Sequence, residues 1–424
     1  MKPGHYRWVI AGMGVMLQMC LGTVYAWSYF QKPLMTEFGW ANSQVAWIFS
    51  LTILFLSLGA AGGGIKLSSI GPRRLAVSGG LLFSAGYILA ALALHIESLP
   101  LLYLGYGVIG GLGLGLGYVT PIATVAKWFP DKKGFITGMV VMGFGLGALL
   151  MSKVFAPLLM ALAHKNLVVV FGSLGVIFFF LTVPVAMFMT NPPAGYAPEG
   201  YHPDGHASTV GAQAAQHSGG ALQFAMMWLF FFCNIVAGIM FIGFQSPMLQ
   251  SILQTTHAAM SADRLAACGA TLIAVSSIFN GVGRFFWGGL SDRIGRIRTF
   301  QAMLGTQVIV FVVLALLGNR INPWLFGGLV CYVLFCYGGG FGTMPSLVLD
   351  VFGFRLMPVL YGLILTAWGI GGIVGPQLVA RIADRVPAQS SLWSFSLGAG
   401  FLLLGFLITL GMKTGRLEAC TKAR

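Results

Sequence analysis

Charged residues are scarce in this chain of 424 residues. Only 8% of the residues are Asp, Glu, Lys or Arg, whereas 57% are hydrophobic and the mean hydropathy is +0.86. An average soluble domain carries roughly a quarter charged residues. There is too little polar surface here to cover a globule in water, so we expect the chain to fold in a lipid bilayer.

Acidic residues and cysteines are especially few. Ten Asp and Glu stand against 24 Lys and Arg, and the formal net charge is +14. Nucleic-acid binding is not indicated, because the basic residues lie between apolar runs and not along one polar face. The six cysteines have no metal-ligand or redox spacing, and no phosphate loop or nucleophile constellation is present. We therefore predict no enzyme activity, no cofactor and no metal.

Apolar runs of about 20 residues, the length that a helix needs to cross a bilayer, recur along the chain. They are predicted at residues 8–30, 45–64, 75–95, 100–126, 134–157, 167–189, 223–244, 265–290, 299–318, 323–348, 358–380 and 391–412. The fold class is therefore all-α integral membrane, with 12 transmembrane helices.

One long polar segment, residues 190–222, divides the apolar runs six and six. It is rich in Pro, Gly, Ala and His, which predicts a flexible cytoplasmic linker between an N-terminal six-helix bundle, residues 1–189, and a C-terminal six-helix bundle with a short tail, residues 223–424. A weak repeat, GGGIKLSSIGPRR after the second run and WGGLSDRIGRIR after the eighth, indicates two pseudo-symmetric halves. Such halves usually place a substrate at their interface near the midplane.

Lys and Arg predict the orientation of the chain. With the N-terminus inside, 16 basic residues fall on the cytoplasmic side and seven on the other. Both termini are therefore expected in the cytoplasm, and the chain is expected to be a multi-pass protein of the cytoplasmic (inner) membrane. We expect it to be a monomer with the lipid bilayer as its main partner.

Arg284 lies well inside an apolar run, whereas the other Lys and Arg residues lie between the runs or near their ends. A charge at the centre of a membrane helix costs about 2.5–3.5 kcal/mol. It could reach the cytoplasmic headgroups, but side chains on this descending helix point toward the bilayer centre. It could also bind backbone carbonyls or a carboxylate, although all ten acidic residues fall in predicted loops or at the ends of runs. The third interpretation is that Arg284 binds a substrate carboxylate through its planar pair of donors.

Polar and aromatic residues accompany this arginine. Asn280 precedes Arg284 by four residues on the same helical face, and its amide would contact either the substrate or a neighbouring helix. Several tyrosines each combine an apolar ring with a hydroxyl, and they would line the cavity, pack in the core or form an interfacial belt: Tyr25, Tyr118, Tyr337 and Tyr361.

The two repeated loops resemble the motif between the second and third helices of the major facilitator superfamily. The copy after the eighth run is complete, and the resemblance implies a conformational role for its residues Gly289, Asp292, Arg293, Gly295 and Arg296. The first copy departs from the motif, because Ser68 stands where an aspartate is expected.

A closer resemblance covers almost the whole chain. GTVYAWSYFQKP, KWFPDKKG, GFGLG, FNGVGRFFWGGLSDRIGR and GGGFGTMPSLVLDVFG, in this order, are similar to the oxalate/formate antiporter family, a bacterial relative of the monocarboxylate transporters. The resemblance implies that Arg284 is the carboxylate-binding residue and that Tyr118 and Tyr361 are cavity tyrosines. Phe341 occupies a position where a tyrosine often stands in that family.

The eleventh run departs from this family in a way that bears on the substrate. Antiporters for oxalate carry a lysine where this chain has Trp368. One fixed cation compensates one carboxylate, and desolvating a second without a partner would cost several kcal/mol. We therefore expect alternating-access transport of a small monocarboxylate similar to lactate, pyruvate or formate, by exchange or with a co-transported proton. The alternatives are an oxalate/formate-type dicarboxylate exchanger and a non-transporting membrane sensor with a carrier fold.

Overall fold

The computed structural model describes residues 3–131, 133–193, 196, 198, 220–256 and 259–412. These residues form helices and their connections, with no strand among them. Twelve helices in the described chain are long and apolar enough to cross a membrane, which confirms the predicted number. They are Tyr6–Ala26, Asn42–Ile70, Pro72–His95, Leu99–Trp128, Ile136–Leu162, Leu167–Ala186, Ala221–Thr256, Ala262–Ile294, Arg296–Leu317, Pro323–Gly353, Val359–Arg385 and Pro387–Gly411.

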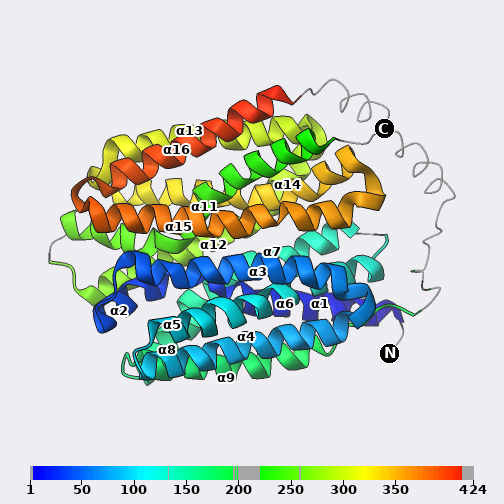
Figure 1. The fold of residues 1–424 in the computed structure, drawn as a ribbon, viewed down its shortest axis with the longest axis horizontal. Coiled ribbons are helices and arrows are strands. Elements are labelled where there is room, and N and C mark those ends of the chain that lie inside the picture. The colour runs from blue at the N-terminus through cyan, green and yellow to red at the C-terminus, as the bar shows by residue number, and fades with distance from the viewer. Residues whose placement is uncertain are drawn as a thin grey trace.

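The helices run roughly along the long axis of the molecule and form two groups, which lie one above the other in Figure 1. The first group contains α1 (Pro3–Gly22), η1 (Thr23–Ala26), α2 (Ser28–Phe38), α3 (Asn42–Ile70), α4 (Pro72–His95), α5 (Leu99–Leu102), η2 (Tyr103–Gly110), α6 (Gly111–Trp128), α7 (Lys133–Leu150), η3 (Met151–Phe155), α8 (Ala156–Leu162) and α9 (Leu167–Ala186). The second contains α11 (Ala221–Thr256), α12 (Ala262–Ile294), α13 (Arg296–Leu317), η4 (Gly318–Arg320), α14 (Pro323–Ile364), α15 (Thr366–Arg385), η5 (Pro387–Gln389) and α16 (Ser390–Gly411). We call these groups the N-half and the C-half.

The helix boundaries differ from the predicted runs where the backbone is irregular. The first run was expected as one helix over residues 8–30, but α1 ends at Gly22 and the chain passes through the 3₁₀ segment Thr23–Ala26 before α2 begins at Ser28. Gly353 has a positive φ of 76° and breaks α14 before the eleventh span begins at Val359. Most of the predicted linker, residues 190–222, lies outside the described residues, and α11 already begins at Ala221.

The loops of the weak sequence repeat have the same backbone turn in both halves. Gly71, between α3 and α4, has φ 84° and ψ 153°, and Gly295, between α12 and α13, has φ 93° and ψ 147°. Residues with a side chain rarely adopt such angles, so glycine is required at both turns. The repeat in the sequence therefore corresponds to a repeated turn in the structure.

The two halves are joined by polar contacts at one end of the molecule. Lys165 of the N-half and Asp263 of the C-half form an ion pair with an N–O distance of 2.7 Å. Lys153 donates a hydrogen bond to Thr271 across the same boundary, and the Ser43 backbone N–H donates to Asp384. We call this end the opposite side, because α1 begins and α16 ends at the other end, which we call the terminal side (Figure 1).

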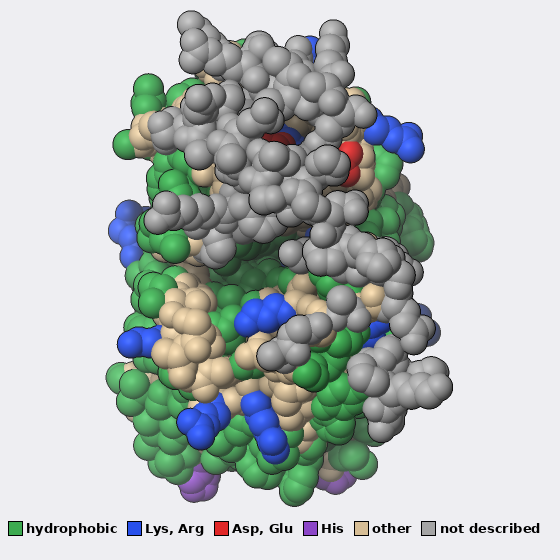
Figure 2. Space-filling model, turned by 90° about the vertical axis from the view of Figure 1, so that its right-hand side faces the viewer, with side chains coloured by type: hydrophobic (Ala, Val, Ile, Leu, Met, Phe, Trp, Pro, Cys, Tyr) green, Lys and Arg blue, Asp and Glu red, His purple; other side chains and the backbone are tan. Residues whose placement is uncertain are grey.

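The terminal side is arranged differently. The ion pairs seen there among the described residues lie within one half: Arg7 with Asp131 in the N-half, and Arg296 with Asp292 and Asp350 in the C-half. Figure 2 shows this face, on which hydrophobic surface is set back between the two halves and Lys and Arg side chains lie nearby. The described contacts thus close the molecule at the opposite side, and a hollow faces the terminal side.

Glycines bring α12 and α14 into close backbone contact. A Cβ at Gly338 would meet the backbone of Asn280, and one at Gly342 would meet the backbone of Arg284. A Cβ at Gly283 would likewise meet the backbone of Phe335. Small residues permit such approach between membrane helices. The crossing therefore fixes the position of the α12 turn that carries Arg284.

We expect Gly342→Ala to destabilise the protein by roughly 1–3 kcal/mol, because the added methyl group overpacks the α12–α14 crossing. Gly328→Ala is the matched control, since nothing lies within 4 Å of the position of its Cβ on the same helix. Thermal unfolding of both purified variants measures the difference. Equal midpoints for Gly342→Ala and Gly328→Ala would contradict a tight crossing.

Candidate functional site

Arg284 is buried in the middle of the bundle on α12. Only 4% of its surface is exposed, so it does not extend to water at the end of the helix. Its Nε and Nη1 atoms have no hydrogen-bond partner. Two nitrogen donors of a permanently charged group are therefore unpaired inside the protein. This costs free energy unless a hydrogen-bond acceptor pairs with them.

No carboxylate of the described chain pairs with Arg284. The ion pairs among the described residues join Arg7 to Asp131, Lys165 to Asp263, and Arg296 to Asp292 and Asp350. The described part of the chain therefore does not support the interpretation that Arg284 is a structural residue paired with a protein carboxylate.

An aromatic ring takes the place of a counter-ion. The guanidinium carbon of Arg284 lies 5.1 Å from the centroid of the Phe341 ring on α14. Such a cation–π contact contributes about 2 kcal/mol or more when it is shielded from water. It offsets part of the desolvation cost but supplies no hydrogen-bond acceptor, so it leaves the donors of Arg284 open to a ligand.

The four predicted tyrosines gather around this arginine. Tyr25, Tyr118, Tyr337 and Tyr361 all interact electrostatically with the Arg284 side chain. The Tyr118 hydroxyl lies within hydrogen-bonding reach of it. They come from different elements: Tyr25 from η1, Tyr118 from α6, and the other two from α14.

Two of these tyrosines connect the halves of the protein. The hydroxyls of Tyr25 in the N-half and Tyr337 in the C-half are 2.9 Å apart and share a hydrogen bond. Both side chains are almost fully buried. The site therefore lies at the boundary between the halves, where relative movement of the halves would change it.

Trp368 closes the site on the side of α15. Its side chain is fully buried, and its ring centroid lies 5.0 Å from Phe341 and 5.4 Å from Tyr118. The indole Nε1 makes no hydrogen bond of normal geometry, but it lies within hydrogen-bonding reach of the Tyr337 hydroxyl. Trp368 thus supplies an apolar wall and one N–H donor, but no charge.

Asn280 lies one helical turn before Arg284 and is also buried. Its Oδ1 atom has no hydrogen-bond partner, and its backbone is part of the contact with Gly338. Oδ1 thus accepts no hydrogen bond from a neighbouring helix. Asn280 therefore adds an unused acceptor next to the unused donors of Arg284.

Phe144 on α7 belongs to this cluster but was not anticipated. Its ring contacts Tyr25, Tyr118 and Trp368, with centroid distances of 5.0, 5.1 and 6.0 Å. The only sequence signal was its place in GFGLG, where the glycines indicate a tight helix crossing. Nothing in the sequence indicated which helix would receive the ring.

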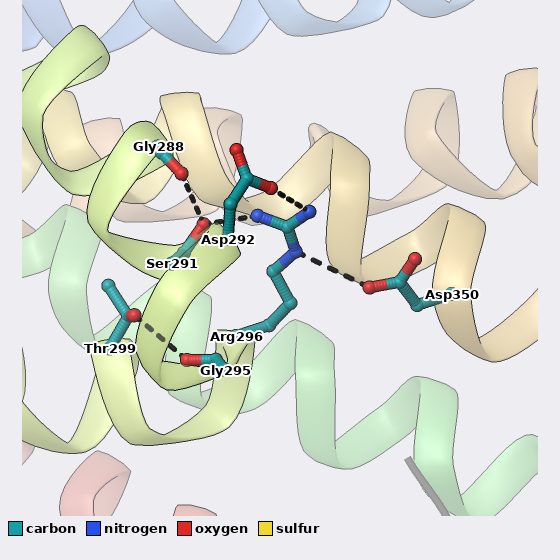
Figure 3. A network of polar contacts seen from close by, with 7 residues as sticks. All are labelled: Gly288, Ser291, Asp292, Gly295, Arg296, Thr299 and Asp350. Atoms are coloured by element: carbon teal, nitrogen blue, oxygen red, sulfur yellow. Dashed lines mark hydrogen bonds and ion pairs between the residues drawn. The ribbon is translucent and has the colours of Figure 1, made fainter. Parts of the chain in front are cut away.

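The Gly289–Arg296 motif forms a network on the terminal side (Figure 3). Arg296 contacts Asp292 at 2.5 Å, Asp350 of α14 at 3.3 Å, and the hydroxyl of Ser291. Gly295 makes the turn between α12 and α13, whereas Arg293 is exposed and open space surrounds the Cβ position of Gly289. The network ties α12, α13 and α14 together within the C-half.

The described residues hold no cluster of three or more His, Cys, Asp or Glu that could hold a metal ion. Five of the six cysteines are described, and each is free. The side chains around Arg284 offer positive charge, unpaired hydrogen-bond donors and apolar contact, which suit an anion.

Twelve membrane-crossing helices in two halves, with a buried cationic site between them, define a multi-pass membrane transporter. The chain belongs to the Major Facilitator Superfamily, whose family model matches residues 9–376. Fold and family are those of transporters and not of enzymes.

Relatives and solved structures extend this comparison. The chain is 29% identical to the MFS-type transporter YhjX of Escherichia coli strain K12, covering 88% of each chain. It is 28% identical to the oxalate:formate antiporter of Oxalobacter formigenes, covering 89% of this chain and 85% of that protein. It is 27% identical to apicoplast pyruvate carrier 1 of Toxoplasma gondii, covering 88% and 83%. The fold matches the crystal structure of a D-xylose-proton symporter with a TM-score of 0.73 at 13% identity, covering 95% and 97%.

Proposed function

We propose that this protein is a secondary active carrier of small monocarboxylates, similar to lactate, pyruvate or formate, in the cytoplasmic membrane. The observation that carries the proposal is the buried guanidinium of Arg284, whose Nε and Nη1 donors have no partner. A carboxylate carries two acceptor oxygens and one negative charge, so it can accept charge-assisted hydrogen bonds from such donors. The substrate would thus complete the charge and the hydrogen bonds that the protein leaves open.

The surroundings of Arg284 favour an anion with one carboxylate. Arg284 is the only Lys or Arg among the buried side chains of the described chain. A second carboxylate would meet Trp368 and Phe341, which offer no compensating charge. A small apolar tail would instead fit against these rings, while Tyr118 and Asn280 would contact polar atoms of the substrate. The relatives named for oxalate, formate and pyruvate support the class of small organic anions.

Transport would proceed by alternating access of the site between the halves. In this proposal the terminal side faces the cytoplasm, and the contacts at the opposite side open when the halves rotate. The Tyr25–Tyr337 hydrogen bond spans the halves and would re-form around the bound anion. The Arg296 network would keep α12, α13 and α14 together as one body during this movement.

Replacing Arg284 with Lys tests the anchor. We expect Arg284→Lys to reduce uptake of labelled substrate at least tenfold, because a point charge does not reproduce the paired donors. Uptake into proteoliposomes is measured beside thermal unfolding, which reports on folding. Near-normal uptake by Arg284→Lys, together with substantial uptake by Arg284→Ala, would reject the role of Arg284 as anchor.

Replacing Trp368 tests the number of charges. In the wild type, we expect lactate to inhibit uptake more strongly than oxalate, because one cation compensates one carboxylate. Trp368→Lys should raise the ratio of oxalate to lactate inhibition, and Trp368→Phe, which keeps an apolar ring, should not. The shift is expected to be partial, since burial of the new lysine disfavours its charged form. Strong oxalate inhibition of the wild type would instead support a dicarboxylate exchanger.

Vesicles without internal substrate test the coupling. We expect exchange, because Asn280 is not titratable and no described Asp, Glu or His pairs with Arg284 to carry a proton. Empty vesicles should accumulate little substrate under a pH gradient, whereas preloaded vesicles should accumulate it rapidly. Strong uptake driven by the gradient into empty vesicles would establish proton symport.

A further inference from the structure

A second feature lies outside the Arg284 site, on the outer surface near the opposite side. An open groove of about 400 Å³ runs along α15 and is lined by Trp47, Ile373, Val374, Gln377, Leu378, Arg381, Ile382 and Leu397. A smaller groove, of about 230 Å³, continues it past Arg385 and Trp393. The lining comes from α3 of the N-half and from α15 and α16 of the C-half, which lie next to one another in Figure 1.

The groove is apolar at its inner end and cationic at its outer end. Val374, Leu378, Arg381 and Arg385 follow one another along one face of α15 at helical spacing. From residue 374 to residue 385 the helix rises roughly 16 Å at 1.5 Å per residue. That length is about half of the ~30 Å hydrocarbon core, so the groove matches the depth of one leaflet.

The arginines at the outer end lack a protein counter-ion. Arg381 and Arg385 lie one turn apart on the same helix, where like charges repel. No ion pair found among the described residues includes either of them. The nearby Asp384 accepts a hydrogen bond from the Ser43 backbone N–H at 3.0 Å, so its carboxylate is engaged with α3. An anion at this position would relieve the repulsion.

The aromatic residues place this end of the groove at the surface of the bilayer. Trp393 is half exposed, and its Nε1 donates a hydrogen bond to Gln389 at 3.2 Å. Tryptophans are enriched where the hydrocarbon meets the headgroups. Gln377 marks the polar boundary inside the groove, because its Nε2 donates to the Ser43 carbonyl across the halves at 3.2 Å.

From these observations we infer that the groove binds an anionic phospholipid, with an acyl chain along Val374, Leu378 and Leu397 and the phosphate at Arg381 and Arg385. Charge complementarity selects the phosphate, and the apolar length along α15 selects a lipid over a free anion. Because the lining includes Trp47 of α3, the lipid contacts both halves where they meet. Its binding therefore favours the arrangement that is closed on the opposite side.

Native mass spectrometry of the full chain tests this inference. The protein is incubated with equal amounts of phosphatidylglycerol and phosphatidylcholine, and the retained lipid is counted. The wild type should retain phosphatidylglycerol preferentially, and the double variant Arg381→Gln/Arg385→Gln should bind it about 10- to 30-fold more weakly. Arg264→Gln/Arg320→Gln is the matched control, since it removes the same charge on the same side without changing the groove.

A variant of the apolar part separates a lipid from a small anion. Leu397→Trp fills the groove but keeps both arginines, and its partly exposed position tolerates a larger side chain. It should weaken phosphatidylglycerol binding, whereas added inorganic phosphate should not compete with the lipid in the wild type. Equal retention of both lipids, or equal loss in the two double variants, would overturn the inference. The measurement needs no transport, so its outcome is independent of the proposed substrate.

Discussion

The desolvated guanidinium of Arg284 is the constraint on which the site depends. A permanent charge inside a bundle of apolar helices is stable only if other groups compensate it. Here Phe341 supplies a ring face at 5.1 Å, and four tyrosines supply dipoles, while Nε and Nη1 keep no partner. The protein stabilises the cation enough to hold it, and no described carboxylate neutralises it. If a protein carboxylate were paired with Arg284, it would occupy the donors that an anion needs and so block anion binding.

The backbone around this cation is as important as the side chains. Gly338 and Gly342 let α14 approach the turn of α12 that carries Asn280 and Arg284, so the position of the guanidinium depends on glycines that contribute no chemistry. The chain is irregular at Thr23–Ala26, where Tyr25 enters the site, and the helix break at Leu365 precedes Trp368. Discontinuous helices are a common way for transporters to build sites near the midplane.

The arrangement of contacts between the halves relates the site to movement. Ion pairs and hydrogen bonds cross the boundary at the opposite side, whereas the ion pairs between described residues on the terminal side stay within one half. The Tyr25–Tyr337 hydrogen bond crosses the boundary at the level of the site. A ligand at Arg284 and a lipid in the α15 groove would therefore act on the same movement from two places, the first from the centre and the second from the membrane.

The sequence by itself determined the class of fold and the central residue. Hydrophobic length predicts twelve spans because a bilayer requires about 20 apolar residues for each crossing, and Arg284 is conspicuous because a charge within such a run is costly. The tyrosines and Trp368 were also predicted, although through family resemblance as much as through their own chemistry. Only the tertiary structure decided that Phe144 and Phe341 complete the cluster, that Tyr25 meets Tyr337, and that Trp47 shares a groove with Arg381. The helical period shows which residues share a face of one helix, but not which helix packs against that face. That choice depends on close packing between segments hundreds of residues apart.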